Sequence, residues 1–189
     1  MKKIAVFLAD GFEEIEALTV VDVTRRAGLH TDIVSVEGEF VRSAHNIVVK
    51  ADKLFNEDEL NSYDMIVFPG GLPGAENLAN DERVKKLVKE FNDAKKFIAA
   101  ICASPAMVLA AAGIEENRYI TSYPGEDFEN ILDKANYVEE LVVVDENIIT
   151  SRGPATTLLF AYKIVDCLGE NSETLKEGML WNALEEEKE

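Results

Sequence analysis

Short apolar runs alternate with longer amphipathic segments along most of the chain. The runs predict buried strands over Lys3–Leu8, Asp32–Val36, Met65–Phe68 and Phe97–Ile101. Apolar residues at three- and four-residue spacing predict helices over Phe12–Ala27, Glu82–Ala94, Pro105–Ala112, Pro154–Leu168 and Ser172–Glu189. This alternation predicts an α/β doubly wound sandwich, with a mostly parallel sheet and helices on both faces.

Turn signals between these segments predict two hairpins. One covers Glu39–Val49 and turns near His45-Asn46, and the other joins Leu141–Val144 to Ile148–Thr150. No linker, repeat or low-complexity block separates the elements. We therefore expect residues 1–189 to form a single domain, with the acidic run at 185–189 frayed.

Composition narrows the classes of function. The 189 residues include 36 Asp and Glu against 19 Lys and Arg, a formal net charge of -17, which repels phosphate backbones and disfavours nucleic acid as a partner. No window approaches the roughly 20 apolar residues of a membrane span. The basic, apolar N-terminus lacks a small-residue cleavage site and predicts a strand rather than a signal peptide. With only two cysteines, no disulfide framework is predicted, and we expect a cytoplasmic protein.

Cys102 is the first candidate for chemistry. It ends the strand Phe97–Ile101 and precedes a helix start at Ala103-Ser104-Pro105. This is the pattern of a nucleophile elbow, with sulfur in place of a serine oxygen. Backbone N–H groups at such a helix entrance lower the pKa of a thiol and can hold an oxyanion. The alternative is a buried cysteine that only fills space, which is the role we expect for Cys167.

Glu16 is the second candidate, because it shares a helix face with the apolar residues Phe12, Val20 and Val23. A carboxyl group in an apolar stripe has a raised pKa and can serve as a general acid or base. In its protonated form it would donate to the cysteine sulfur. Alternatively, Glu16 reaches the edge of the helix and pairs with an arginine of a second subunit.

Gly70 and Gly71 follow the strand Met65–Phe68 and indicate close backbone approach, either to a ligand or to Cys102. Their spacing lacks the pattern of a dinucleotide or phosphate loop, so no nucleotide cofactor is predicted. His30 and His45 lie apart in the sequence from each other and from any acid or cysteine cluster. No metal site is therefore predicted.

Four motifs together resemble the ThiJ/PfpI superfamily and, within it, the branch of the parkinsonism-associated DJ-one. They are Ala9–Ala17, Phe68–Gly71, Ala99–Ala103 and Thr150–Pro154, in this order along the chain. The resemblance implies a flavodoxin-like sandwich, usually a homodimer, with an oxidation-sensitive cysteine. It also implies that a protonated Glu16 hydrogen-bonds Cys102, that the Gly71 and Ala103 N–H groups form an anion pocket, and that Arg152 and Pro154 lie beside that pocket.

Three positions bear on which branch the chain follows. Ala103 stands where the protease-like branch has a histidine, which disfavours peptidase activity. Tyr123 stands where relatives closest to DJ-one carry a histidine, so histidine-assisted proton transfer is in doubt. His45 stands about where relatives have an arginine that lines the pocket from the partner subunit.

The resemblance implies a cysteine-dependent glyoxalase or deglycase that acts on α-oxoaldehydes or glycated groups, without glutathione, metal or organic cofactor. The competing hypothesis is an oxidative-stress sensor with chaperone-like binding, in which Cys102 becomes a sulfinate. A third, purely structural role for Cys102 is the least favoured. We also expect a homodimer, because Ile15, Leu18 and Val21 form a second apolar face on the first helix.

Overall fold

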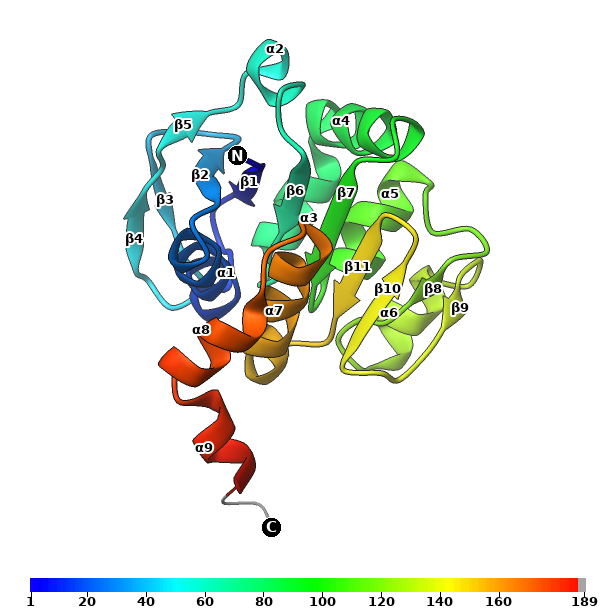
Figure 1. Ribbon diagram of the computed structural model, residues 1–189. Coiled ribbons are helices and arrows are strands. Elements are labelled where there is room, and N and C mark those ends of the chain that lie inside the picture. The colour runs from blue at the N-terminus through cyan, green and yellow to red at the C-terminus, as the bar shows by residue number, and fades with distance from the viewer. Residues whose placement is uncertain (187–189) are drawn as a thin grey trace.

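The computed structural model describes residues 1–186 and contains a seven-stranded sheet of order β10-β11-β7-β6-β1-β2-β5 (Figure 1). Every neighbouring pair is parallel except β10 and β11. The strands of this sheet are β1 (Lys3–Leu8), β2 (His30–Ser35), β5 (Lys53–Leu54), β6 (Met65–Phe68), β7 (Phe97–Ile101), β10 (Val142–Asp145) and β11 (Ile148–Ser151). The mostly parallel sheet confirms the predicted fold class.

Helices cover both faces of the sheet and create two apolar cores (Figure 1). Successive side chains of β1 point to opposite faces: Val6 joins the core beneath α1 (Glu14–Arg26) and α7 (Thr157–Cys167), whereas Phe7 joins the core beneath α4 (Glu82–Asp93). Burial on both faces explains why these strands are apolar throughout rather than alternating.

The remaining elements are short. The helical ones are α2 (Glu57–Leu60), α3 (Gly74–Asn80), the π-helical η1 (Pro105–Leu109), α5 (Ala110–Ala112), α6 (Glu126–Ile131), the 3-10 turn η2 (Pro154–Thr156), α8 (Ser172–Gly178) and α9 (Trp181–Glu186). Two small sheets pair β3 (Phe40–Arg42) with β4 (Val48–Lys50), and β8 (Tyr119–Ile120) with β9 (Asn136–Tyr137). The β3–β4 and β10–β11 pairs are antiparallel and confirm both predicted hairpins.

The C-terminal segment differs from the prediction of one helix over Ser172–Glu189. The helix breaks after Gly178, and Leu180 adopts a φ of 61°, in the left-handed region that ends a helix. The new direction of the chain sets the ring of Trp181 edge-on against Tyr162, at 5.8 Å between ring centroids. Aromatic packing onto α7 therefore accompanies the break. Residues 187–189 of the acidic run lie outside the described residues.

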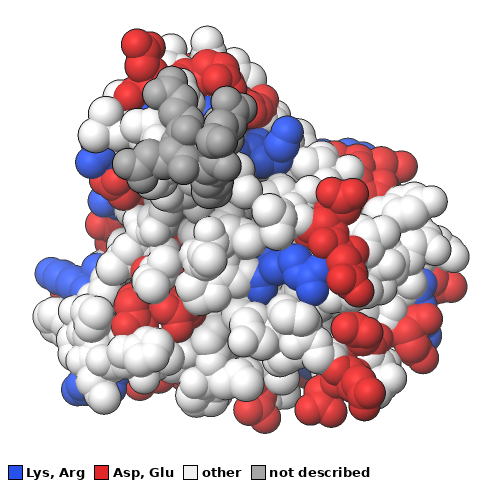
Figure 2. Space-filling model, turned by 90° about the horizontal axis from the view of Figure 1, so that it is seen from below, with Lys and Arg blue, Asp and Glu red and all other residues white. Residues whose placement is uncertain are grey.

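Acidic side chains are spread over the face shown in Figure 2, with a broad uncharged area between them. This face is the lower one in Figure 1, toward which the carboxyl ends of the parallel strands point. Among residues 1–186, no helix is both long and apolar enough to cross a membrane.

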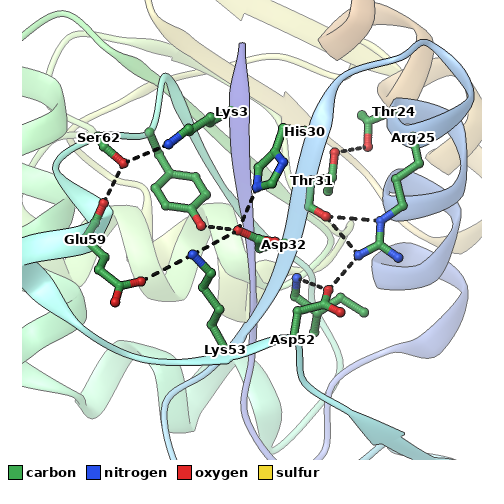
Figure 3. A network of polar contacts seen from close by, with 12 residues as sticks. Lys3, Thr24, Arg25, His30, Thr31, Asp32, Asp52, Lys53, Glu59 and Ser62 are labelled. Atoms are coloured by element: carbon green, nitrogen blue, oxygen red, sulfur yellow. Dashed lines mark hydrogen bonds and ion pairs between the residues drawn. The ribbon is translucent and has the colours of Figure 1, made fainter. Parts of the chain in front are cut away.

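A polar network lies at one side of the sheet, where β2 pairs with the edge strand β5 (Figure 3). The buried Asp32 accepts hydrogen bonds from the Tyr63 hydroxyl and from His30 Nε2, the latter at 3.1 Å, and Lys53 Nζ lies 3.6 Å away. Burial opposes the ionisation of Asp32, but these partners outweigh it and hold the pKa of Asp32 below its ordinary value. The network thus ties β2, β5 and the loop before β6 together.

Candidate functional site

Cys102 lies at the sharp turn between β7 and η1 and has a φ of 64°, which is rare for a residue with a side chain. Its backbone is held on both sides. The Cys102 N–H donates to the Ser151 carbonyl of β11 at 3.0 Å, and the Tyr123 N–H donates to the Cys102 carbonyl at 2.8 Å. Such strain persists only where the surrounding structure over-determines it, and it is typical of functional sites.

The loop after β6 packs against this turn without room for side chains. A Cβ on Gly70 would lie 2.6 Å from the Cβ of Cys102 and 2.9 Å from Oε2 of Glu16. Gly71 has a φ of 85°, and a Cβ there would lie 2.4 Å from the Glu13 backbone nitrogen. Ser104 fastens the two turns together, because its hydroxyl donates to the Pro69 carbonyl at 2.6 Å. The glycines therefore serve close approach to Cys102 and to the start of α1.

Glu16 is fully buried on α1, and its side chain reaches this turn. Its Oε2 accepts a hydrogen bond from the Gly70 N–H at 2.7 Å, and its carboxyl group is hydrogen-bonded to Cys102. Burial raises the pKa of Glu16 to about 7, although these two hydrogen bonds act against it. A carboxyl group with this pKa can both take and give a proton near neutral pH.

The thiol behaves differently from the expectation of a lowered pKa. Burial, followed by the charge of the Glu16 carboxylate, raises the pKa of the Cys102 thiol to about 12. The N–H groups of Gly71 and Ala103 are hydrogen-bonded to the sulfur and act in the opposite direction. The expectation was wrong because it took Glu16 to be protonated and left out the burial of the thiol. A negative charge on Glu16 opposes a negative charge on sulfur, so the two groups titrate as a pair.

A small cavity of about 260 Å³ opens above the sulfur. Its lining is almost wholly apolar and consists of Gly71, Leu72, Cys102, Ala103, Tyr123 and Phe128. The rings of Tyr123 and Phe128 meet edge to face, with centroids 6.1 Å apart, and form one wall. The site therefore offers a sulfur, two backbone N–H donors and one carboxyl group to a small, weakly polar molecule.

Two residues expected at the pocket, Arg152 and Pro154, are not among those that line this cavity. Gly153, which stands between them, packs on the cavity residue Tyr123, where a Cβ would lie 3.4 Å from the ring, so the loop lies beside the cavity. His45, whose expected place is a pocket of the partner subunit, faces α1 of its own chain, where its Nδ1 lies 3.0 Å from Glu14.

Although the two histidines lie apart from acidic clusters in the sequence, both contact acidic side chains in the structure. His30 contacts Asp32, and His45 contacts Glu14 and, at 3.7 Å, Glu13. The ligand atoms of Glu13, Glu14 and His45 all lie within 4.8 Å of one another. The hydrogen bond and charge of Glu14 raise the pKa of His45, which favours an ion pair at this position.

Sequence reasoning missed Leu72 and Phe128, which complete the cavity. Leu72 is on the loop after the glycine pair and shows no pattern of its own. Phe128 lies on α6. The sequence signal for this helix consists of an acidic first turn and of Phe128 and Leu132, which are four residues apart. A six-residue helix gives too few apolar positions for a reliable periodicity.

A doubly wound sheet with a strained cysteine at the end of a central strand, beside a buried carboxyl group, defines a flavodoxin-like protein with a cysteine-centred site. Residues 2–167 match the family described as the DJ-1/PfpI family. The chain belongs to this family, as its motifs predict.

Known relatives agree with this assignment. Protein DJ-1 homolog B of Arabidopsis thaliana is 39% identical over 87% of this chain, which spans only 37% of that relative. The glutathione-independent glyoxalase DJ-1 of Schizosaccharomyces pombe is 31% identical, over 88% of this chain and 91% of its own length. The structure of oxidized Toxoplasma gondii DJ-1 has a TM-score of 0.88 and 36% identity, and the match covers 95% of this chain and 98% of that one.

Proposed function

We propose that this protein is a cysteine-dependent glyoxalase that converts α-oxoaldehydes such as methylglyoxal into hydroxy acids. The observation that carries the proposal is the contact of Cys102 with both a carboxyl group of pKa about 7 and two backbone N–H donors. Adducts of the same aldehydes on proteins are substrates of the same chemistry. The name of the S. pombe relative supports this choice of reaction.

The reaction begins with attack of the Cys102 thiolate on the aldehyde carbon. The carbonyl electron pair moves to oxygen, and the N–H groups of Gly71 and Ala103 stabilise the oxyanion. Protonated Glu16 gives its proton to this oxygen, which yields a hemithioacetal and leaves Glu16 as a carboxylate. The N–H donors thus act on charge that appears only during the reaction.

Glu16 then moves hydrogen between the two substrate carbons. Its carboxylate takes the proton from the former aldehyde carbon and returns it to the neighbouring carbon through an enediol. The hydroxyl proton passes to the second oxygen, so the first carbon is oxidised and the second reduced without an external oxidant. The product is a thioester of Cys102, and water cleaves it to release the hydroxy acid and the thiol.

The test is lactate formation from methylglyoxal by the wild-type protein, Cys102→Ser and Cys167→Ser. We expect activity in the wild type and in Cys167→Ser, and at least a hundredfold lower activity in Cys102→Ser. The comparison is matched because both variants lose one thiol. Equal rates in Cys102→Ser and the wild type would exclude the covalent route.

A second function, redox sensing with chaperone-like binding, is favoured by the same two N–H donors, since they suit the oxygens of a cysteine sulfinate. The oxidized state of the similar T. gondii protein supports this alternative. Wild-type protein that forms no lactate but gains a stable sulfinate under mild peroxide would favour the sensor.

We also propose that the protein is a homodimer formed through the start of α1. Ile15 is 52% exposed there. In the nearby hairpin, whose His45 contacts α1, Ile47 is 48% exposed and Val48 is 49% exposed. Val21, expected on the same face, is instead buried in its own chain. Apolar side chains gathered in this way are typical of a surface covered by a second copy.

Light scattering tests the dimer. We expect a dimer at micromolar concentration, and a monomer after Ile15→Glu. The control Val144→Glu adds the same charge at a residue of similar exposure on β10, and it should leave the dimer intact. A monomeric wild-type protein would contradict the proposal.

A further inference from the structure

A second cavity lies beside α6, separate from the one above Cys102. It has a volume of about 510 Å³ and is bounded by α3, by η1 with α5, and by the end of α6 and the loop after it. Phe128 of α6 contributes to the Cys102 cavity, whereas Ile131 of the same helix contributes to this one. The two cavities share no lining residue, so binding in this one does not require the chemistry of Cys102.

Glu115 is the unusual group in this second cavity. Only 5% of the residue is exposed, and its Oε2 is buried without a hydrogen-bond partner among the described residues. No ion pair joins its carboxyl group to any described side chain. A buried carboxyl oxygen without a hydrogen-bond partner is costly, so a site that keeps one is expected to receive a partner from a ligand.

The surroundings of Glu115 combine apolar walls with an acidic rim. Ala106 is buried in the wall, and Met107 and Ala110 are half-buried next to it. Glu76 and Asp133 stand exposed at the opening, with one basic residue, Lys134. Taken together with Glu115, the lining has three acids and one base. Such a cavity attracts cations and accommodates an alkyl chain.

We propose that this cavity binds a primary ammonium group carried on a short alkyl stem, as in a free alkylamine or a lysine side chain. The ammonium pairs with the Glu115 carboxyl group in the cavity wall, and the stem lies along Ala106, Met107 and Ala110. A metal ion fits less well. Among residues 1–186, Glu13, Glu14 and His45 are the group whose ligand atoms converge on one point, and the acids of this cavity are not part of it.

The test is a titration with n-butylammonium chloride at neutral pH and constant ionic strength, followed by amide NMR shifts. We expect saturable shifts in the residues around Ala106 and Ala110, with n-butanol as the neutral probe of the same stem. Glu115→Gln should weaken binding at least about tenfold, because a hydrogen bond to a charged group is worth that much.

The matched control is Glu116→Gln, which removes the same charge from the neighbouring exposed residue. It should bind as the wild type does. Lys134→Met should bind as tightly or more tightly, since it removes the competing cation at the opening. Glu115→Gln is expected to fold, because the amide has nearly the size and shape of the carboxyl group, and its thermal unfolding is recorded to confirm this.

A second probe, N-acetyl-lysine methylamide, distinguishes the two sources of the ammonium group. Binding of both probes supports a site open to lysine side chains on polypeptides, and binding of butylammonium alone supports a site for free amines. No saturable binding of either probe would overturn the proposal. Equal affinity of the wild type and a folded Glu115→Gln, or equal shifts with n-butanol, would also overturn it.

Discussion

The buried carboxyl group of Glu16 predicts a specific dependence of stability on pH. Glu16→Gln removes the ionisable group and keeps a side chain of similar size that can still accept from the Gly70 N–H. The pKa of Glu16 is raised by burial from an ordinary value of 4.5 to about 7 in the folded protein. Its contribution to stability is therefore fully present below pH 4.5 and is lost as the pH rises through 7.

The magnitude follows from the two pKa values. At about 1.4 kcal/mol per pH unit, ionising Glu16 in the folded state costs on the order of 3 kcal/mol of unfolding free energy. The variant does not incur this cost. The difference in unfolding free energy between Glu16→Gln and the wild type should therefore shift by about 3 kcal/mol in favour of the variant between pH 4.5 and 8.5. This shift does not depend on how stable the variant is at pH 4.5.

Urea unfolding of both proteins across this pH range, followed by circular dichroism, measures the difference directly. The charges that both proteins share cancel in the comparison. Glu129→Gln, at an exposed residue of α6, shows what the loss of one surface charge does by itself. Parallel curves for Glu16→Gln and the wild type would refute the assignment of a raised pKa to Glu16.

Three further changes test other parts of the structure. Mild peroxide should oxidise Cys102 well before Cys167, as mass spectrometry of the two peptides would show; equal rates would contradict an activated Cys102. Gly70→Ala should abolish lactate formation and lower the melting temperature, because the new Cβ would lie 2.6 Å from that of Cys102; a fully active variant would contradict this packing. Tyr63→Phe should destabilise the protein by about 1–3 kcal/mol in urea unfolding, because the buried Asp32 loses a hydrogen-bond donor; unchanged stability would argue against that network.

The fold was predictable because burial on both faces of the sheet leaves long apolar runs in the sequence. The elbow could also be found, since Cys102 stands between an apolar strand and a helix start with proline. Glu16 stood out as one carboxyl group in an apolar helical stripe. All three signals are local, so the spacing of residues along the chain is enough to reveal them.

The other features depend on contacts between distant segments. The pairing of His45 with Glu14 brings a hairpin turn to the start of α1, which no local pattern shows. The break at Leu180 follows from packing onto α7. The raised pKa of Cys102 arises from burial and from the charge of Glu16, 86 positions away in the numbering of the chain. The sign of such a pKa shift depends on which groups come into contact, so it can be worked out only from the folded structure.

The central claim is that Cys102 and Glu16 share their protons, so that a thiolate becomes available near neutral pH. Below about pH 7 the pair holds two protons, and between about 7 and 12 it holds one. In the single-proton state the raised pKa of Cys102 keeps most of the proton on the sulfur. The thiolate belongs to the minor form, in which the proton is on Glu16 and the Gly71 and Ala103 N–H groups stabilise the sulfur.

The most direct test is the rate of alkylation of Cys102 by iodoacetamide as a function of pH, in a Cys167→Ser background. The account predicts a rise centred near pH 7 that disappears in Glu16→Gln, where the thiol reacts only at higher pH. A wild-type rate that stays low until strongly alkaline pH, or that follows the same curve in Glu16→Gln, would contradict it.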